Sequence, residues 1–229
     1  MREVSGILVA AHDLKAPLTT IRQLALALDG MDEEGEGIRT EMVNVSERAL
    51  RQVNDLVKLP QLEEGLFKME PVAIRAVCDD VLEELVGLFD FDRQNFKVRY
   101  QNRSRLVTAN KELLSSVIYN FLSNAIHYSS GRKTRTELLV GERAGKIRVE
   151  IRDFGPALPI KIWREMKDGF IAEPKSIAMR PGSSGLGLYI ASKFAKYMDA
   201  KVGAVRHRDG TSFFVELAIS KQMSLWGLE

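Results

Sequence analysis

Two adjacent residues near the start of the chain, His12 and Asp13, pair a nucleophile with a base. A neutral imidazole attacks electrophilic centres, and a neighbouring carboxylate can take its proton. Both side chains point away from the apolar seam of a helix that carries Ala11 and Leu14 on that seam. Pro17 removes one helical N–H and leaves the carbonyl of Asp13 without its helical partner. By itself, the segment is better explained as an exposed surface histidine beside an accidental proline.

Asn120 and Asn124 form a second polar pair, four residues apart among apolar neighbours. At this spacing both side chains lie on one face of a helix, one turn apart. Amide oxygens ligate hard cations and contact phosphates without adding negative charge. Solvated asparagines on a surface helix are the alternative, which explains one asparagine better than a stacked pair.

Two glycine-containing segments complete the set of polar candidates. Asp153 directly follows a predicted strand, where its carboxylate can accept a hydrogen bond from an exocyclic amine and so select adenine. Gly155 permits close approach of the backbone. The glycines within 182–187 precede a predicted helix and present backbone N–H groups to an anion. The common alternative for the Asp153 segment is a Gly-Pro turn, and for 182–187 it is a flexible linker. Residues 210–213 are a weaker signal of the same glycine-containing kind.

The overall composition excludes several classes of protein. The 229 residues include 33 Lys and Arg against 31 Asp and Glu, a net charge of +2 that gives no basic patch for nucleic acid. A single cysteine forms neither an internal disulfide nor a thiolate metal site, and it fits a reducing compartment. Apolar residues make up 45% of the chain, without a run of about 20 that would span a bilayer.

The spacing of apolar residues predicts the elements that carry the first pair. Apolar residues recur every three and four positions along 4–28 and again along 38–59, with a polar, glycine-containing break between the two stretches. This spacing places an apolar seam on each of two long helices, which a short loop joins into an antiparallel hairpin. One hairpin cannot bury two wide apolar faces, so we expect a homodimeric four-helix bundle.

After residue 65 the heptad pattern ends and helices alternate with strands. This mixed order predicts an α/β sandwich, so the whole chain is of the α+β class. We place the domain boundary between the hairpin, 1–67, and the sandwich, 68–229. Helices are expected at 74–89, 111–129, 160–166 and 186–198, and strands at 96–100, 137–141, 146–152, 202–206 and 213–219.

Taken in order, four segments resemble the sensor histidine kinases of two-component signalling. HDLKAPL is similar to the H-box, NFLSNAIHYS to the N-box, DFGPALP to the G1 box and GSSGLGLYIASKFA to the G2 box. The resemblance covers nearly the whole chain. It implies a dimerising hairpin that bears the phosphoacceptor, joined to an ATP-binding sandwich of the Bergerat (GHKL) fold with a mobile lid.

The resemblance also implies a role for each matched residue. His12 would be the phosphoacceptor and Asp13 its general base. Asn124 would be the principal Mg²⁺ ligand, with Asn120 assisting at the metal and the γ-phosphate. Asp153 would hold the adenine amine. The other residues expected at the ATP site are His127, Tyr128, Gly155, Ala157, Ser184, Gly185, Leu186, Gly187 and Thr211, with a lid over 172–184.

Four positions depart from the family pattern. Ala16 stands where many relatives carry a Thr or Asn that positions water, so we expect weak phosphatase activity toward the partner regulator. His127 replaces a Lys or Arg, which reduces charge compensation at the phosphates and predicts modest ATP affinity. Ala157 and Ser183 each replace a glycine, and Ala157 is harmless where its φ is negative.

We therefore expect an ATP- and Mg²⁺-dependent protein-histidine kinase. It would phosphorylate His12 within a homodimer and pass the phosphoryl group to an aspartate on the receiver domain of a response regulator. A pseudokinase scaffold without chemistry is the alternative. A superfamily ATPase is disfavoured, because those relatives have a water-activating Glu where this chain has Asn120.

The same resemblance sets the expected partners and location. We expect no nucleic-acid partner and a soluble, cytoplasmic fragment. Family kinases extend upstream to a sensor, so the parent protein is expected to be linked to a membrane through an N-terminal sensor region.

Overall fold

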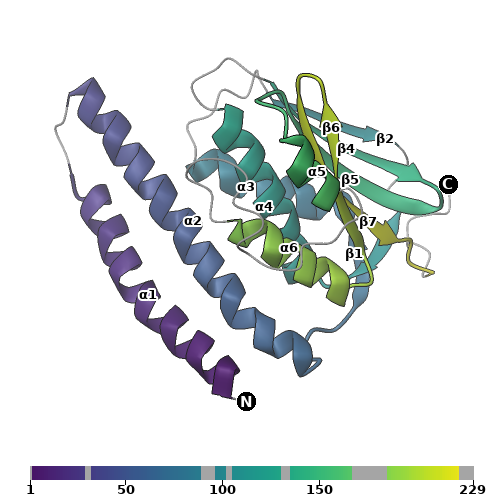
Figure 1. Ribbon diagram of the computed structural model, residues 1–229, viewed down its shortest axis with the longest axis horizontal. Helices are drawn as coiled ribbons and strands as arrows, with labels where there is room; N and C mark the ends of the chain where they lie inside the picture. Colours follow the sequence, from purple (N-terminus) through teal and green to yellow (C-terminus); the bar gives the residue numbers. More distant parts are fainter. Residues whose placement is uncertain are drawn as a thin grey trace. The chain divides into compact units, whose positions relative to one another are not determined.

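A computed structural model of the chain describes residues 2–28, 32–88, 96–101, 105–129, 135–166 and 185–221. Its internal contacts divide the chain into two compact units. One is Met1–Leu66 with Val86–Asp90, and the other is Phe67–Leu85 with Phe91–Glu229. The first unit is built on a pair of long helices, and the second combines helices with β-sheet (Figure 1).

The first unit is a pair of antiparallel helices, α1 (Arg2–Leu26) and α2 (Glu33–Glu63), packed along their lengths (Figure 1). Helix α2 begins earlier than the apolar spacing predicts, because Asp32 caps it. The Asp32 side chain accepts a hydrogen bond of 2.9 Å from the Gly35 N–H. The helix ends before Gly65, whose φ of +68° favours glycine.

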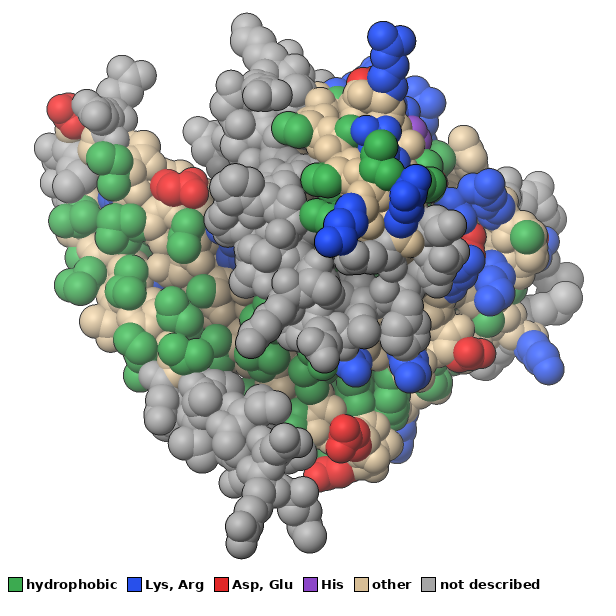
Figure 2. All heavy atoms as spheres, in the orientation of Figure 1, with side chains coloured by type: hydrophobic (Ala, Val, Ile, Leu, Met, Phe, Trp, Pro, Cys, Tyr) green, Lys and Arg blue, Asp and Glu red, His purple; other side chains and the backbone are tan. Residues whose placement is uncertain are grey.

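Much of the apolar seam of the first unit stays exposed. Ala25 and Val53 are buried, and an ion pair between Arg22 and Glu47 links the two helices. Figure 2 shows hydrophobic side chains gathered along this helical pair. The large apolar side chains that remain exposed on α1, on α2 and just after α1 are Leu14, Ile21, Leu24, Leu26, Leu28, Ile38, Met42 and Val45.

The second unit contains a five-stranded sheet in the order β2-β4-β5-β7-β6. Strand β2 is parallel to β4, and the other neighbours are antiparallel. The strands are β2 (Phe96–Gln101), β4 (Thr136–Arg143), β5 (Lys146–Asp153), β6 (Lys201–His207) and β7 (Gly210–Ala218).

Helices cover one face of this sheet. Helix α4 packs on β5 and on α6, and α6 contacts β6 (Figure 1). The stacked rings of Phe121 on α4 and Phe213 on β7, 5.7 Å apart, lie in this layer. The helices of the second unit are α3 (Ile74–Leu88), which belongs to this unit as far as Leu85, α4 (Lys111–Ser129), α5 (Ile160–Met166) and α6 (Leu186–Tyr197).

A two-stranded sheet of β1 (Glu70–Ala73) and β3 (Leu106–Ala109) was not predicted from the sequence. It adjoins the end of β7, where the Ser220 N–H donates a 2.8 Å hydrogen bond to the Leu106 carbonyl. Each of its strands has four residues, too few to show an alternating pattern.

Candidate functional site

A row of buried polar side chains crosses the sheet at the end of β5. Asp153 ends β5, and its register neighbours are Thr136 on β4 and Thr211 on β7. Paired residues share a face of the sheet, and Asp153 continues the buried face of Ile151. The Asp153 side chain is 1% exposed. A carboxylate at this depth is suited to accept hydrogen bonds from a ligand that excludes water.

The loop after β5 is fixed to this row by two hydrogen bonds. The Gly155 N–H donates to Asp153 Oδ1 at 3.0 Å. Further along the loop, the Leu158 N–H donates to Thr211 Oγ1 at 3.3 Å. The structure therefore brings together three of the expected site residues, Asp153, Gly155 and Thr211.

Ala157, the replacement for a family glycine, causes no backbone strain. Among the described non-glycine residues, positive φ occurs at Ala144 and Asp199, and Ala157 is not one of them. A methyl group at a residue with negative φ is compatible with the backbone. The loop geometry therefore tolerates the departure noted at this position.

Gly210, the first residue of β7, packs against the backbone that carries Asp153. Its φ is +144°, and a Cβ atom there would overlap the Asp153 carbonyl oxygen and lie 3.0 Å from Cα of Phe154. Any other residue would displace the end of β5. From the sequence, 210–213 is the weakest of the glycine-containing signals, and this role of Gly210 was not predicted. The Asp-Gly pair at a hairpin turn is the signal that points to it.

Phe154 lies beside two guanidinium groups. The Cζ atoms of Arg152 and Arg135 lie 4.3 Å and 6.0 Å from the ring centroid. Cation–π attraction acts within about 6 Å. Arg152 is itself paired with Asp209 at 2.9 Å. These contacts hold the ring of the residue that follows Asp153, a role that the sequence did not indicate.

The two asparagines lie one turn apart on α4, which contacts β5. Asn120 is buried and Asn124 half-buried. Asn120 Nδ2 donates to the Ser116 carbonyl at 2.9 Å, and no described residue donates to its Oδ1. This bond orients the amide with its nitrogen toward Ser116, and an amide oxygen is a ligand that Mg²⁺ accepts.

The N-terminus of α6 is a second potential contact for an anion. Gly185 adopts the left-handed conformation, with φ of 68° and ψ of −4°, and no described side chain caps the helix. Gly187 is buried in the first turn and Leu186 is half-buried. Backbone N–H groups at such an end favour negative charge. Because α6 contacts α4, the glycines and the asparagines lie on neighbouring elements.

Other expected site residues fall outside this description. Ser184 and the expected lid over 172–184 lie in a stretch beyond the described residues. For four more, the helical backbone is described and the side chains are not. These are His12 and Asp13 on α1 and His127 and Tyr128 on α4.

Among the described residues, no cluster of three or more His, Cys, Asp or Glu is arranged to hold a metal ion. No helix in this described part of the chain is both long and apolar enough to cross a membrane. Cys78 is buried on α3, and burial raises the pKa of its thiol to about 12, so the thiol stays protonated at neutral pH.

Comparison with known proteins places these features in a family. Residues 109–221 match the family described as histidine kinase-, DNA gyrase B-, and HSP90-like ATPase. The sensor histidine kinase WalK of Bacillus subtilis is 27% identical over 194 residues, which cover 81% of this chain and 31% of WalK. The adaptive-response sensory kinase SasA of Synechocystis is 26% identical, over 91% of this chain and 57% of SasA. The chain thus spans about a third to just over half of these relatives.

The fold agrees with these relationships. The structure of full-length ShkA in complex with AMPPNP matches with a TM-score of 0.62 and 19% identity, over 94% of this chain and 46% of ShkA. The expected GHKL-type α/β sandwich is confirmed. Residues 109–221 therefore form a histidine kinase-, DNA gyrase B- and HSP90-like ATPase domain, and the chain as a whole is similar to the catalytic cores of sensor histidine kinases.

Proposed function

We propose that this chain is an ATP-dependent protein-histidine kinase core that phosphorylates His12 and passes the phosphoryl group to an aspartate of a response regulator. The observation that carries the proposal is the buried Asp153, set between Thr136 and Thr211 within the ATPase domain. Its carboxylate accepts a hydrogen bond from the adenine amine. A guanine carbonyl at that position would face the carboxylate without a donor, so the site selects adenine.

The phosphates lie toward the asparagines and the start of α6. Asn124 and Asn120 would hold Mg²⁺ through their amide oxygens, and the ion would neutralise phosphate charge when bound. The orientation of the Asn120 amide supports this assignment. The other residues assigned to the ATP site are His127, Tyr128, Gly155, Ala157, Ser184, Gly185, Leu186, Gly187 and Thr211.

The reaction transfers the γ-phosphoryl group to an imidazole nitrogen of His12. A nitrogen–phosphorus bond forms as the bond from the γ-phosphorus to the bridging oxygen of ADP breaks. The ring proton passes to the Asp13 carboxylate. Positioning and charge neutralisation supply most of such catalysis. Asn120 argues against hydrolysis, because an amide cannot deprotonate water.

The hairpin serves as the dimerisation domain in this proposal. We assign 1–67 to dimerisation and phosphotransfer and 68–229 to ATP binding. The exposed seam on α1 and α2, with Ile21 and Leu14 about half exposed, supports a four-helix bundle formed with a second copy. We place the protein in the cytoplasm, where ATP and the receiver domain are available.

Phosphatase activity toward the phosphorylated regulator is proposed to be weak. Ala16 is exposed on α1, four residues after His12, and its methyl group cannot hydrogen-bond a water molecule. The Ala16→Thr variant should dephosphorylate the regulator faster than the wild type. Equal, fast rates for the two proteins would contradict this part of the proposal.

Labelling with γ-³²P ATP tests the kinase reaction. The wild type should acquire acid-labile, alkali-stable label that a purified receiver domain then removes, and His12→Gln should acquire none. Nucleotide binding without label would identify a pseudokinase scaffold instead. Release of free phosphate without labelled protein would identify an ATPase.

A further inference from the structure

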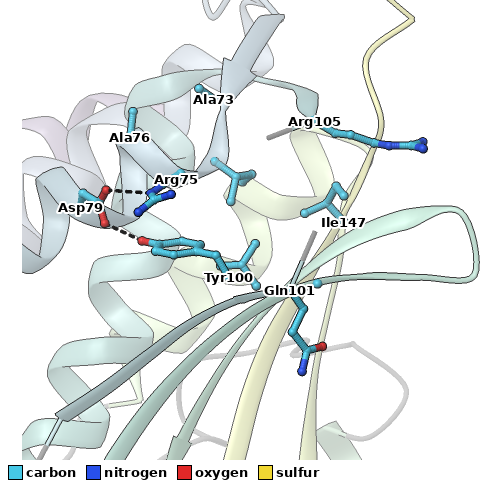
Figure 3. Close-up of a pocket in the computed structure, with 11 residues that line it drawn as sticks. Ala73, Arg75, Ala76, Asp79, Tyr100, Gln101, Arg105 and Ile147 are labelled. Carbon is cyan, nitrogen blue, oxygen red and sulfur yellow. Dashed lines mark hydrogen bonds and ion pairs between the residues drawn. The ribbon is translucent and has the colours of Figure 1, made fainter. Parts of the chain in front are cut away.

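A cavity of about 320 Å³ lies in the second unit (Figure 3), and its lining includes none of Asp153, Thr136 and Thr211. Its lining comes from β1, the first turn of α3, the ends of β2 and β4, and the start of β5. Ile147 in its wall precedes Asp153 by six residues on β5, roughly 20 Å along an extended strand. The cavity is therefore separate from the proposed ATP site. Its volume is within the range of small-molecule pockets.

One wall of the cavity is a linked set of polar groups. Tyr100 Oη donates a 2.5 Å hydrogen bond to Asp79 Oδ1, and Arg75 Nε lies 3.7 Å from Asp79 Oδ2. The Arg75 guanidinium also lies over the Tyr100 ring, 4.7 Å from its centroid. Burial, and then the hydrogen bond to Asp79, raise the pKa of Tyr100 well above its usual value. The phenol therefore stays protonated and keeps Asp79 engaged.

The other walls are mostly apolar, with Gln101 and Arg105 as further polar side chains. Figure 3 shows Ile147 on the side of the cavity away from Asp79, with the short side chains of Ala73 and Ala76 along its edge. Val140 and Ile74 complete this surface. Rings pack well against such walls, since each apolar contact removes area from water.

Arg75 is the cation that a ligand in this cavity would meet. The Arg105 side chain points away from the other labelled residues (Figure 3) and pairs with Glu142 at 3.6 Å. Arg75 Nε lies 3.7 Å from Asp79 Oδ2, which is too far for a hydrogen bond. The N–H donors of Arg75 can therefore bind an acceptor on the ligand.

We infer that this cavity binds a small, mostly apolar ring compound carrying one hydrogen-bond acceptor, a carbonyl or a carboxylate, which contacts Arg75. The ring system packs between the Tyr100 ring and the side chains of Val140 and Ile147. The acceptor takes the guanidinium N–H groups that Asp79 does not use. This site is additional to the proposed kinase function and does not depend on ATP.

Two probes distinguish the acceptors: 2-naphthoate, a carboxylate, and 2-acetonaphthone, a neutral ketone. Isothermal titration of the whole chain should give a Kd of about 1 mM or tighter for at least one of them. Chemical-shift changes should centre on Tyr100 and Ile147. The stronger of the two ligands identifies the preferred acceptor.

Variants on α3 locate the binding. Ala76→Phe fills the cavity and should abolish binding, and Arg75→Gln should weaken it by about tenfold. Glu83→Phe and Glu83→Gln are matched controls, because Glu83 is exposed on α3 and does not line the cavity. Both should bind the probes as the wild type does. Thermal unfolding of each variant checks that it is folded.

Two results would overturn the inference. One is the absence of binding by the wild type at millimolar concentrations of both probes. The other is unchanged binding by folded Ala76→Phe, which would place the probes elsewhere. If Ala76→Phe does not fold, the chemical-shift changes that the probes cause in the wild type test the inference instead. Changes confined to residues outside the cavity lining would also overturn it.

Discussion

The two units bury their predicted apolar residues to different extents. In the second unit, residues such as Val117, Phe121 and Val149 are almost fully buried within the one chain. In the first unit, Leu14, Ile21 and Leu28 lie on the predicted seam and remain between about a third and a half exposed. A layered sandwich can close its own core, whereas a pair of helices has too few neighbours to cover both faces.

This contrast separates two kinds of requirement. The second unit needs internal fit, above all at the end of β5, where Gly210 touches the backbone of Asp153. The first unit needs a partner surface, which we propose to be a second copy. Substitutions that disturb fit should therefore act on the second unit alone, and substitutions on the seam should act on association.

Gly210→Ala should have the largest effect. The added Cβ overlaps the Asp153 carbonyl, so we expect a loss of about 3 kcal/mol in the free energy of unfolding of the second unit, together with loss of ATP binding. Tryptophan fluorescence during urea unfolding reports this unit, because Trp163 lies in it and its Nε1–H donates a hydrogen bond to the Ala204 carbonyl.

Gly145→Ala is the matched control for this change. Its φ of +74° is also positive, yet nothing lies within 4 Å of an added Cβ. It should cost about 1 kcal/mol, from backbone conformation alone. Equal losses for the two variants would show that the contact with Asp153 is unimportant.

Ile21→Glu should weaken dimerisation by about 100-fold. In a twofold-symmetric bundle the change acts in both copies, at about 1 to 1.5 kcal/mol each. Sedimentation equilibrium measures the dimer, and nucleotide binding by the second unit should be unchanged. Leu66→Glu alters an exposed leucine outside both helices and should leave the dimer intact. Dissociation by both variants alike would contradict the seam as the interface.

Asp153→Asn should lower the affinity for ADP by about 30-fold, roughly 2 kcal/mol, because the amide replaces the charged acceptor that we propose for the adenine amine. Calorimetry measures the affinity, with GDP as the competing ligand. Asp199→Asn changes an exposed aspartate and should bind ADP as the wild type does. Unchanged affinity in Asp153→Asn would remove the carboxylate from the adenine site.

Phe154→Leu should weaken ADP binding by about fivefold, since it removes roughly 1 kcal/mol of cation–π attraction that holds the loop. Phe154→Tyr keeps an aromatic ring over Arg152 and should restore the affinity. If the Phe154 ring acted only through apolar packing, the leucine variant, whose side chain is also apolar, would bind ADP as tightly as the tyrosine variant. The ratio of the two affinities therefore separates positioning from packing.

His207 should produce the smallest effect, a pH dependence of stability. Burial, and then the charge of Arg152, lower the pKa of His207 in the folded protein below its usual value. The unfolded state then binds the proton more tightly, so this contribution to stability is present above about pH 6.5 and is lost as the pH falls. Urea midpoints at pH 7.5 and 5.5 should differ more for the wild type than for His207→Gln. Equal differences would contradict the assignment.

The sequence predicted elements better than it predicted contacts across the fold. The helices at 111–129 and 160–166 appear with the predicted bounds, because apolar spacing reports which face of an element is buried. The strand Glu70–Ala73 was missed because it is short and contains Pro71, which suits an edge strand and gives no alternating pattern.

At the candidate site, residue types were readable from the sequence and their supports were not. Asp153 and Asn120 could be identified because a polar residue among apolar neighbours is conspicuous in a linear pattern. Arg135, Arg152 and Gly210 could not, since their importance comes from strands that meet at one point of the sheet.

The sequence by itself determined the helical seams, the order of helices and strands, and the four boxes that indicate the family. All of these depend on residues close together along the chain. The tertiary structure alone decided that Gly210 lies against Asp153, that Ala157 is unstrained, and that a cavity forms beside Tyr100. Each of these depends on strand register and on the packing of distant segments, which local spacing does not encode.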